Sequence, residues 1–218
     1  MPSVNELELH VAWQRFVAAE RAWFDAVLER HREPHRRYHS VRHLRWVVRH
    51  AVALTDAYAT RIGDAGAVVA AAFFHDVVYD PTAHTNEAAS AGLAERALGE
   101  LGWPVPRASR VATLVRATAE HAARAGPDDE LDTAVLLAAD LAVLAADPAS
   151  YQEYVIGVRA EYSHVDDAAW RAGRTRVLRS FVDRVAIYDP VLGLTDWERR
   201  ARANLAAELA TLTGVSGG

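Results

Sequence analysis

The order of apolar and polar residues along the chain predicts a protein built from helices. Apolar residues recur at i, i+3, i+4 and i+7 in nearly every segment, and no segment shows the period-two alternation of a half-buried strand. Capping-box patterns at residues 3–6 and 195–198, and an Asp147-Pro148 pair, mark three helix starts. We therefore expect an all-α fold, with helices over about residues 4–30, 41–60, 67–78, 86–101, 131–145, 148–162, 167–187 and 195–212, and a further helix that includes residues 111–121 and ends before Gly126.

The predicted helix at about residues 67–78 is apolar on all sides, which is typical of a helix at the centre of a bundle. We find no internal repeat and no linker long enough to separate domains. The expectation is a single helical domain over residues 1–213, followed by a flexible C-terminal tail at 214–218.

Composition narrows the chemistry that this domain can perform. The 218 residues suit one domain and include no cysteine, so a metal ion would have to be bound by His, Asp or Glu. All 24 basic residues counted as Lys or Arg are arginine, which excludes Schiff-base lysines and the lysine of a P-loop. Arginine remains available to bind phosphate.

Charge and hydropathy argue against two classes of partner. The net charge of −5 is unlike the basic surplus of nucleic-acid-binding modules. The longest uncharged apolar run, residues 65–74, is far shorter than a transmembrane helix, and the N-terminus has no targeting pattern. We therefore expect a cytoplasmic protein, monomeric or homodimeric, that binds neither nucleic acid nor membrane.

The informative residues are polar groups at positions where the pattern requires apolar ones. A His75-Asp76 doublet lies in the predicted central helix, where an ionised carboxylate is costly unless it is paired or bound to a metal. Asp140 shares a helix face with leucine and valine side chains. His39 and His43 lie one helical turn apart, so both can face a common point.

His121 extends the apolar face of another predicted helix, and with it these groups could hold a divalent cation inside a bundle. Taken singly, a buried His or Asp is more often a hydrogen-bonded core residue than a ligand. The coincidence of several inward-facing groups favours a metal site. Five further histidines are expected to be peripheral: His10, His31, His35, His50 and His164.

At these residues the sequence resembles the HD superfamily of metal-dependent phosphohydrolases, whose signature is a His, a His-Asp doublet and a distant Asp. His43, His75-Asp76 and Asp140 match it in order. The resemblance extends over about residues 10–210 to one branch of predicted HD-domain hydrolases. The further features of that branch stand here as Arg37-Tyr38-His39-Ser40, Val77-Val78-Tyr79-Asp80, Asn86-Glu87, Ser90-Ala91, Ala117-Thr118, His121, Arg159-Ala160-Glu161-Tyr162 and Gly173-Arg174.

The resemblance implies a site in which His43, His75, Asp76 and Asp140 ligate one divalent metal ion. A metal ion lowers the pKa of the water it binds and neutralises charge on phosphoryl oxygens, so a metal-dependent phosphohydrolase is the implied activity. Donors of this kind do not distinguish Mn, Mg, Fe, Co, Ni and Zn.

Three residues are catalytic candidates in this site. Asp80 is the first candidate to orient or deprotonate the water, and Glu87 is the second, although a carboxylate in a first helical turn also stabilises its own helix. His121 could hydrogen-bond a phosphate or ligate a second metal ion. His39 has the same two options, and we assign it to substrate binding.

Phosphate recognition needs fork-shaped donors, which arginine supplies. Arg37 and Arg42 flank the predicted ligand helix, and Arg159 and Arg174 belong to the later motifs of the resemblance. All four are candidate substrate-binding residues. Arg159 could equally form a structural ion pair with Glu161.

The predicted substrate is a nucleotide or another small phosphate ester. The stretch from His75 to Asp80 is also similar to the active-site stretch of HD-type alarmone hydrolases, but Tyr79 stands where those enzymes carry a glutamate, which argues against alarmone hydrolysis. Two alternatives remain: a non-catalytic regulatory protein that keeps the metal and binds a nucleotide, and a dinuclear-iron oxygenase. The oxygenase needs extra histidines, for which only His84 and His121 are available between the doublet and Asp140.

Overall fold

The computed structural model describes residues 4–119 and 130–214, and within these ranges the chain is helical with no strand. The all-α prediction is thus confirmed. The contacts divide the chain into two compact units, residues 1–140 and 141–218. The single domain over 1–213 remains a prediction, and residues 215–218 of the expected tail lie outside the described ranges.

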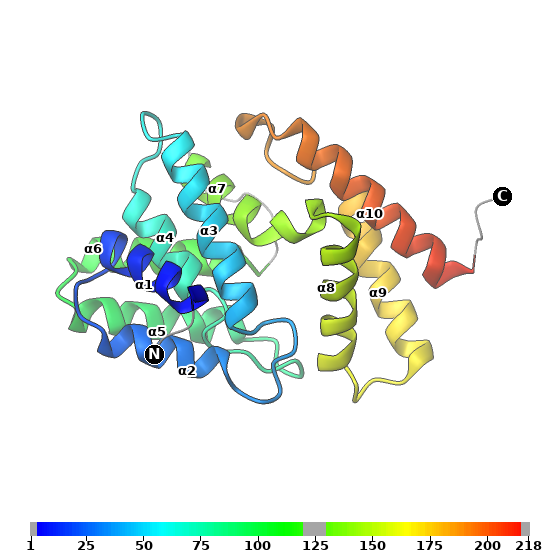
Figure 1. The fold of residues 1–218 in the computed structure, drawn as a ribbon, viewed down its shortest axis with the longest axis horizontal. Coiled ribbons are helices and arrows are strands. Elements are labelled where there is room, and N and C mark those ends of the chain that lie inside the picture. The colour runs from blue at the N-terminus through cyan, green and yellow to red at the C-terminus, as the bar shows by residue number, and fades with distance from the viewer. Residues whose placement is uncertain (1–3, 120–129, 215–218) are drawn as a thin grey trace. The chain divides into compact units, whose positions relative to one another are not determined.

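The first unit is a bundle around one buried apolar helix (Figure 1). Every residue of α4 from Gly66 to Phe74 is buried, as the uninterrupted apolar pattern predicts, and α4 packs against α1, α3, α5, α6 and α7. The helices of this unit are α1 Val4–Phe16, α2 Ala22–His31, α3 Val41–Ala57, α4 Ala65–Phe74, α5 Asn86–Glu100, α6 Val105–Ala117 and α7 Glu130–Asp140.

The second unit contains α8, α9 and α10 with two short 3₁₀ segments (Figure 1). Asp147 and Asp166 cap the starts of α8 and α9 by accepting hydrogen bonds from backbone N–H groups. The bounds are η1 Leu141–Ala145, α8 Pro148–Glu161, α9 Asp167–Val182, η2 Pro190–Leu192 and α10 Thr195–Thr213. The 3₁₀ segment η1 packs against both α8 and α10.

The expected first helix over residues 4–30 is wrong: the chain forms α1 and α2 with a break between them. No Gly or Pro marks the break. Two indoles stabilise it, because Trp13 Nε1 donates to the Glu20 carbonyl at 2.9 Å and Trp103 Nε1 donates to the Val17 carbonyl at 3.0 Å. Long-range hydrogen bonds therefore replace those of a continuous helix, which local periodicity cannot reveal.

Other helices also end earlier than the pattern predicts. The expected helix at 131–145 is an α-helix only to Asp140 and continues as the 3₁₀ segment η1. Asn204 Nδ2 donates to the Leu144 and Ala146 carbonyls, and the Tyr188 hydroxyl donates to the Leu141 carbonyl, so side chains of the second unit satisfy these groups. The expected helix at 167–187 ends at Val182.

Among the described residues, no single helix is both long and apolar enough to cross a membrane. The helical segments at 131–145 and 148–161 reach that length and composition only as a pair, and they bend by 102° where they join.

Candidate metal centre

Two buried imidazoles form the centre of the site. His43 lies in the first turn of α3, and His75 directly follows the last residue of α4. Their side chains are 2% and 1% exposed, and the two Nε2 atoms lie 3.0 Å apart. The buried helix α4 thus brings His75 close to His43, although the sequence pattern placed His75 inside this helix and the structure places it just after the last residue.

The backbone fixes the orientation of His75. Its Nδ1 lies 2.9 Å from the Ala72 carbonyl oxygen, which can only accept, so Nδ1 carries a proton and the neutral ring presents the lone pair of Nε2 to the cluster. Nδ1 of His43 is buried and has no hydrogen-bond partner in the described part of the chain. A backbone contact therefore sets the tautomer of His75, whereas no such contact sets the tautomer of His43 in the described part of the chain.

Two carboxylates complete the cluster. Asp76 Oδ2 lies 3.2 Å from Nε2 of His43 and 3.1 Å from Nε2 of His75. Asp140, the last residue of α7, places Oδ1 at 3.7 Å and 3.5 Å from the same two atoms. The ligand atoms of His43, His75 and Asp140 all lie within 4.8 Å of one another, so this cluster could hold a metal ion.

The distances between the donor atoms suit a divalent metal. An ion bound at about 2.0–2.2 Å separates its ligands by about 3.0 Å at a right angle and by about 3.4 Å in a tetrahedron. The observed separations from the imidazole nitrogens run from 3.0 to 3.7 Å. The lone pair of His75 faces two carboxylates, so a cation or a proton must lie among them.

Electrostatics make His75 the group that holds this proton when no metal is bound. Burial lowers the pKa of His75, but the carboxylates of Asp76 and Asp140 outweigh it and raise that pKa well above its ordinary value of 6.5. Burial raises the pKa of Asp76, but the charge of His75 and hydrogen bonds from both imidazoles hold it well below its ordinary value of 3.8. Burial lowers the pKa of His43, so this ring is neutral at neutral pH.

His39 lies at the side of the cluster where exposure increases. Its Nε2 is 3.9 Å from Asp76 Oδ2, and its ring stacks on Tyr79 with centroids 4.1 Å apart. The side chains of Asp140, Asp76 and His39 are 10%, 15% and 20% exposed, in contrast to the two imidazoles at the centre. The cluster is therefore closed behind the imidazoles and more open at the carboxylates and His39.

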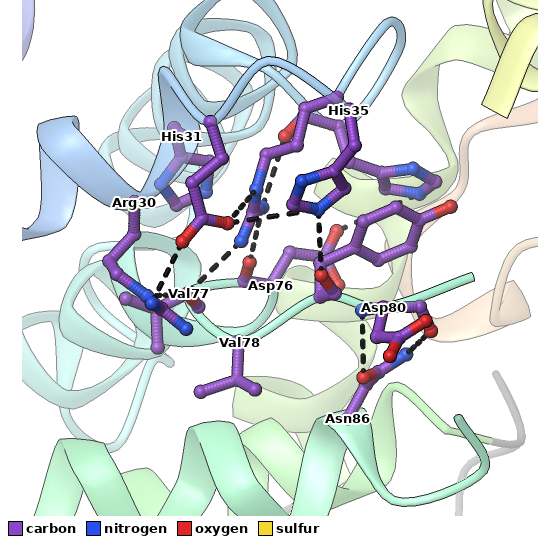
Figure 2. A network of polar contacts seen from close by, with 12 residues as sticks. Arg30, His31, His35, Asp76, Val77, Val78, Asp80 and Asn86 are labelled. Atoms are coloured by element: carbon purple, nitrogen blue, oxygen red, sulfur yellow. Dashed lines mark hydrogen bonds and ion pairs between the residues drawn. The ribbon is translucent and has the colours of Figure 1, made fainter. Parts of the chain in front are cut away.

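The segment at residues 76–80 is not helical, although the sequence predicts a helix to residue 78. Two polar side chains of α5, one helical turn apart, bind its backbone instead, and Figure 2 shows one of them, Asn86, beside Asp80. Asn86 accepts from the amide of Asp80 and donates to its carbonyl, and Ser90 Oγ lies 3.0 and 3.2 Å from the amide nitrogen and carbonyl oxygen of Val78. These side chains satisfy backbone groups that the helix leaves unpaired, so the doublet lies in a fixed loop.

The catalytic candidates lie in three different settings. Asp80 is exposed in the turn after this loop, where Oδ1 accepts from the amide and the hydroxyl of Thr82. Glu87 lies in the first turn of α5, where a carboxylate also stabilises the helix. His121 lies outside the described residues. All three catalytic roles remain predictions.

The arginine candidates also lie in different settings. Arg37 is exposed before α3, and Arg42 is exposed in its first turn, close in sequence to His43. In the second unit, Arg159 donates to the carbonyls of Tyr162 and Val165 and pairs with Asp167.

Arg174 forms a buried pair with Glu208 at 2.7 and 3.0 Å and donates to the Tyr154 hydroxyl. These contacts give Arg159 and Arg174 structural roles within the second unit. Substrate binding by any of the four arginines remains a prediction.

Sequence reasoning missed several residues around the doublet. His31, expected to be peripheral, is 1% exposed, so that expectation is wrong for this residue. His35 Nε2 bonds the Tyr79 carbonyl at 3.0 Å, and the buried Arg36 binds the same loop. Because the chain contains 24 arginines, its composition does not distinguish Arg36 from the others.

Comparisons with protein-family models, with curated proteins and with solved structures found no match to this chain.

Proposed function

We propose that this protein is a divalent-metal-dependent phosphohydrolase of the HD type that acts on a nucleotide or another small phosphate ester. One observation carries the proposal: two buried imidazoles and two carboxylates converge, with the carboxylate side more exposed than the imidazole side. Catalytic metal sites keep an open coordination position, whereas structural sites are closed. The exposure gradient therefore favours a site that a small ligand can reach.

His43, His75, Asp76 and Asp140 would hold the metal. A bound divalent ion would activate a water molecule for attack on phosphorus and neutralise charge on the phosphoryl oxygens. The low pKa of Asp76 keeps this group anionic under all ordinary conditions, so it can balance the charge of the ion. The Ala72 carbonyl holds His75 in the orientation that a ligand requires.

The side chains at the open side would handle the substrate. His39, beside Asp76, is placed to donate a hydrogen bond to a phosphate oxygen, and its stacking on Tyr79 restrains the ring. Arg37 and Arg42 would add cations from the start of α3. Asp80 and Glu87 remain the candidates to orient the attacking water.

The donor set does not select one metal. Mixed imidazole and carboxylate ligands suit Mn, Fe, Co, Ni and Zn, and Mg is compatible with the carboxylates. An iron oxygenase is less well supported, because His84, one of the two extra histidines that it would need, is exposed in the turn before α5.

The test is a phosphate-release assay on purified protein, stripped of metal and then loaded with one of Mn²⁺, Mg²⁺, Co²⁺, Ni²⁺, Fe²⁺ or Zn²⁺. The panel comprises nucleoside mono-, di- and triphosphates and a chromogenic phosphomonoester. We expect metal-dependent release that Asp76→Asn and Asp140→Asn abolish. Asp183→Asn, which makes the same change at an exposed position in the second unit, should retain full activity.

The negative outcomes separate the alternatives. Metal binding without turnover of any panel member would refute the hydrolase proposal. If a nucleotide also binds under those conditions, the regulatory alternative gains support. Failure to bind any metal would remove the basis of both.

A further inference from the structure

Arg36 is a buried cation that lies next to the metal cluster and contacts mainly backbone. Its side chain is 0% exposed, and Nε pairs with Glu33 at 3.1 Å. Nη1 donates to the carbonyls of His39 at 3.1 Å and Asp76 at 2.7 Å, and Nη2 donates to the carbonyl of Val77 at 3.1 Å. One guanidinium thus binds three carbonyl oxygens from two separate loops.

Burial of this charge is unfavourable by itself. Burial lowers the pKa of Arg36, and the nearby carboxylate of Glu33 only partly offsets that effect. A buried cation is normally compensated by a paired anion or by strong hydrogen bonds. At Arg36 three peptide carbonyls supply most of this compensation, so the positions of these carbonyls depend on the guanidinium.

The two loops that Arg36 joins both belong to the site. One loop leads into α3 and contains His39, four residues before His43. The other follows α4 and contains His75 and Asp76. Because Nη1 is shared by the carbonyls of His39 and Asp76, it fixes the separation of these two residues, whose side chains approach to 3.9 Å.

Two neighbouring side chains also bind the second loop, and one of them, His35, comes from the same loop as His39 (Figure 2). Arg30 Nε donates to the Val77 carbonyl at 3.2 Å, and His35 Nε2 contacts the Tyr79 carbonyl. Only a planar group with several donors can bind the carbonyls of both loops at once, and a lysine ammonium lacks that fork. The chemistry therefore requires arginine at this position.

We propose that Arg36 is a positioning residue that sets the distance between the His39 loop and the Asp76 loop and thereby completes the metal centre. It acts through Asp76 and His39, and it is not itself a ligand. The inference rests on the metal-binding part of the proposed function and does not depend on hydrolysis.

The experiment compares Arg36→Lys and Arg36→Ala with wild type in metal-stripped full-length protein. Cobalt(II) is the probe, because its affinity is measured by calorimetry and its visible absorption reports the geometry of its ligands. Arg107→Met is the matched control. It removes a guanidinium that pairs with Asp64 at the opposite end of the same helix α4.

We expect wild type and Arg107→Met to bind Co²⁺ with equal affinity and identical spectra. Arg36→Lys and Arg36→Ala should bind about ten- to a hundredfold more weakly, with a changed visible spectrum, as for other residues that orient metal ligands. Added guanidinium ion should restore part of the affinity of Arg36→Ala, but not that of Asp140→Asn.

The failures are distinguishable. No binding by wild type overturns the proposed function, and this inference with it. Wild-type affinity and spectrum in folded Arg36 variants overturn this inference alone. Failure of both Arg36 variants to fold, judged by circular dichroism, also overturns it, because Arg36 would then serve overall stability.

Discussion

Metal binding should release one proton, and its affinity should fall as the pH falls. The reason lies in His75, whose pKa the carboxylates of Asp76 and Asp140 raise well above 6.5. The metal-free protein therefore carries a proton on this imidazole at neutral pH, at the same Nε2 that a metal must ligate. The metal and the proton compete for one lone pair.

The magnitude follows from the number of protons. His43 is already neutral because burial lowers its pKa, and Asp76 is already ionised because its pKa lies well below 3.8. Of these three groups, only His75 has to lose a proton when the metal binds. Below the folded pKa of His75, each unit decrease in pH should therefore weaken the apparent Kd about tenfold, which is about 1.4 kcal/mol per unit.

The sign of the stability change follows from the same pKa. A raised pKa stabilises the metal-free fold below the ordinary value of 6.5, and this stabilisation is lost as the pH rises through the folded pKa. Bound metal replaces the proton and should remove this dependence. Metal should therefore raise the melting temperature more at alkaline than at acidic pH.

The assay is a calorimetric titration of the stripped protein with Mn²⁺ or Co²⁺ at several pH values, in pairs of buffers with different ionisation enthalpies. The buffer dependence of the heat counts the released protons. His164→Gln serves as the control, because it removes an exposed histidine of the second unit and should leave the count unchanged. A pH-independent affinity without proton release would show that His75 is neutral in the metal-free protein and would refute the reasoning.

Four further outcomes are expected. Burial lowers the pKa of His31 to about 3, so between pH 6.5 and about pH 5 only the unfolded chain binds a proton at this residue. Over that range the free energy of unfolding of wild type should fall by about 2 kcal/mol more than that of His31→Gln. Urea-unfolding free energies that change in parallel with pH for the two proteins would contradict this. Ser90→Ala removes both hydrogen bonds to Val78 and should destabilise by about 1–3 kcal/mol; the check is faster hydrogen exchange in the 76–80 loop than in wild type. Asp132→Ala removes the carboxylate that accepts from the amides of Gly63 and Asp64 and from Arg110 Nη2. The free energy of unfolding, measured by chemical denaturation, should fall by about 3 kcal/mol, and a fall of less than about 1 kcal/mol would contradict this prediction. Inorganic phosphate should bind only after the metal, which calorimetry with stripped and loaded protein tests; equal binding to both forms would contradict it.

The parts of the fold that depend on burial were predictable from sequence. The apolar run at residues 65–74 predicts the buried helix α4, because a helix that is apolar on all sides has no solvent face. His75 and Asp140 stand out for the complementary reason: a polar group among apolar ones needs a partner. The apolar pattern predicts that these two face the core, the helical spacing of His39 and His43 predicts that those two can face a common point, and the structure brings His43, His75 and Asp140 together.

The parts that depend on long-range hydrogen bonds were not predictable. Helix α4 was expected to reach residue 78, but it ends at Phe74 because Arg36 and Ser90 bind the backbone beyond it. The break between α1 and α2 depends on the indole of Trp103, which is distant in sequence. In each case a side chain from another segment contributes to the helix end, and the local pattern carries no information about that pairing.

The charges around the cluster explain why a metal would be needed for any phosphate to bind. Asp76 and Asp140 bring two carboxylates to the site, and the protonated His75 offsets only one of them. The nearby guanidinium of Arg36 is directed at backbone carbonyls, so its donors are already engaged. A phosphate dianion that approached the metal-free cluster would meet net negative charge at short range, where screening by solvent is weak. A divalent ion that replaces the proton of His75 brings the sum of these charges to zero and offers a coordination position to a phosphate oxygen, so the repulsion is removed and phosphate can bind.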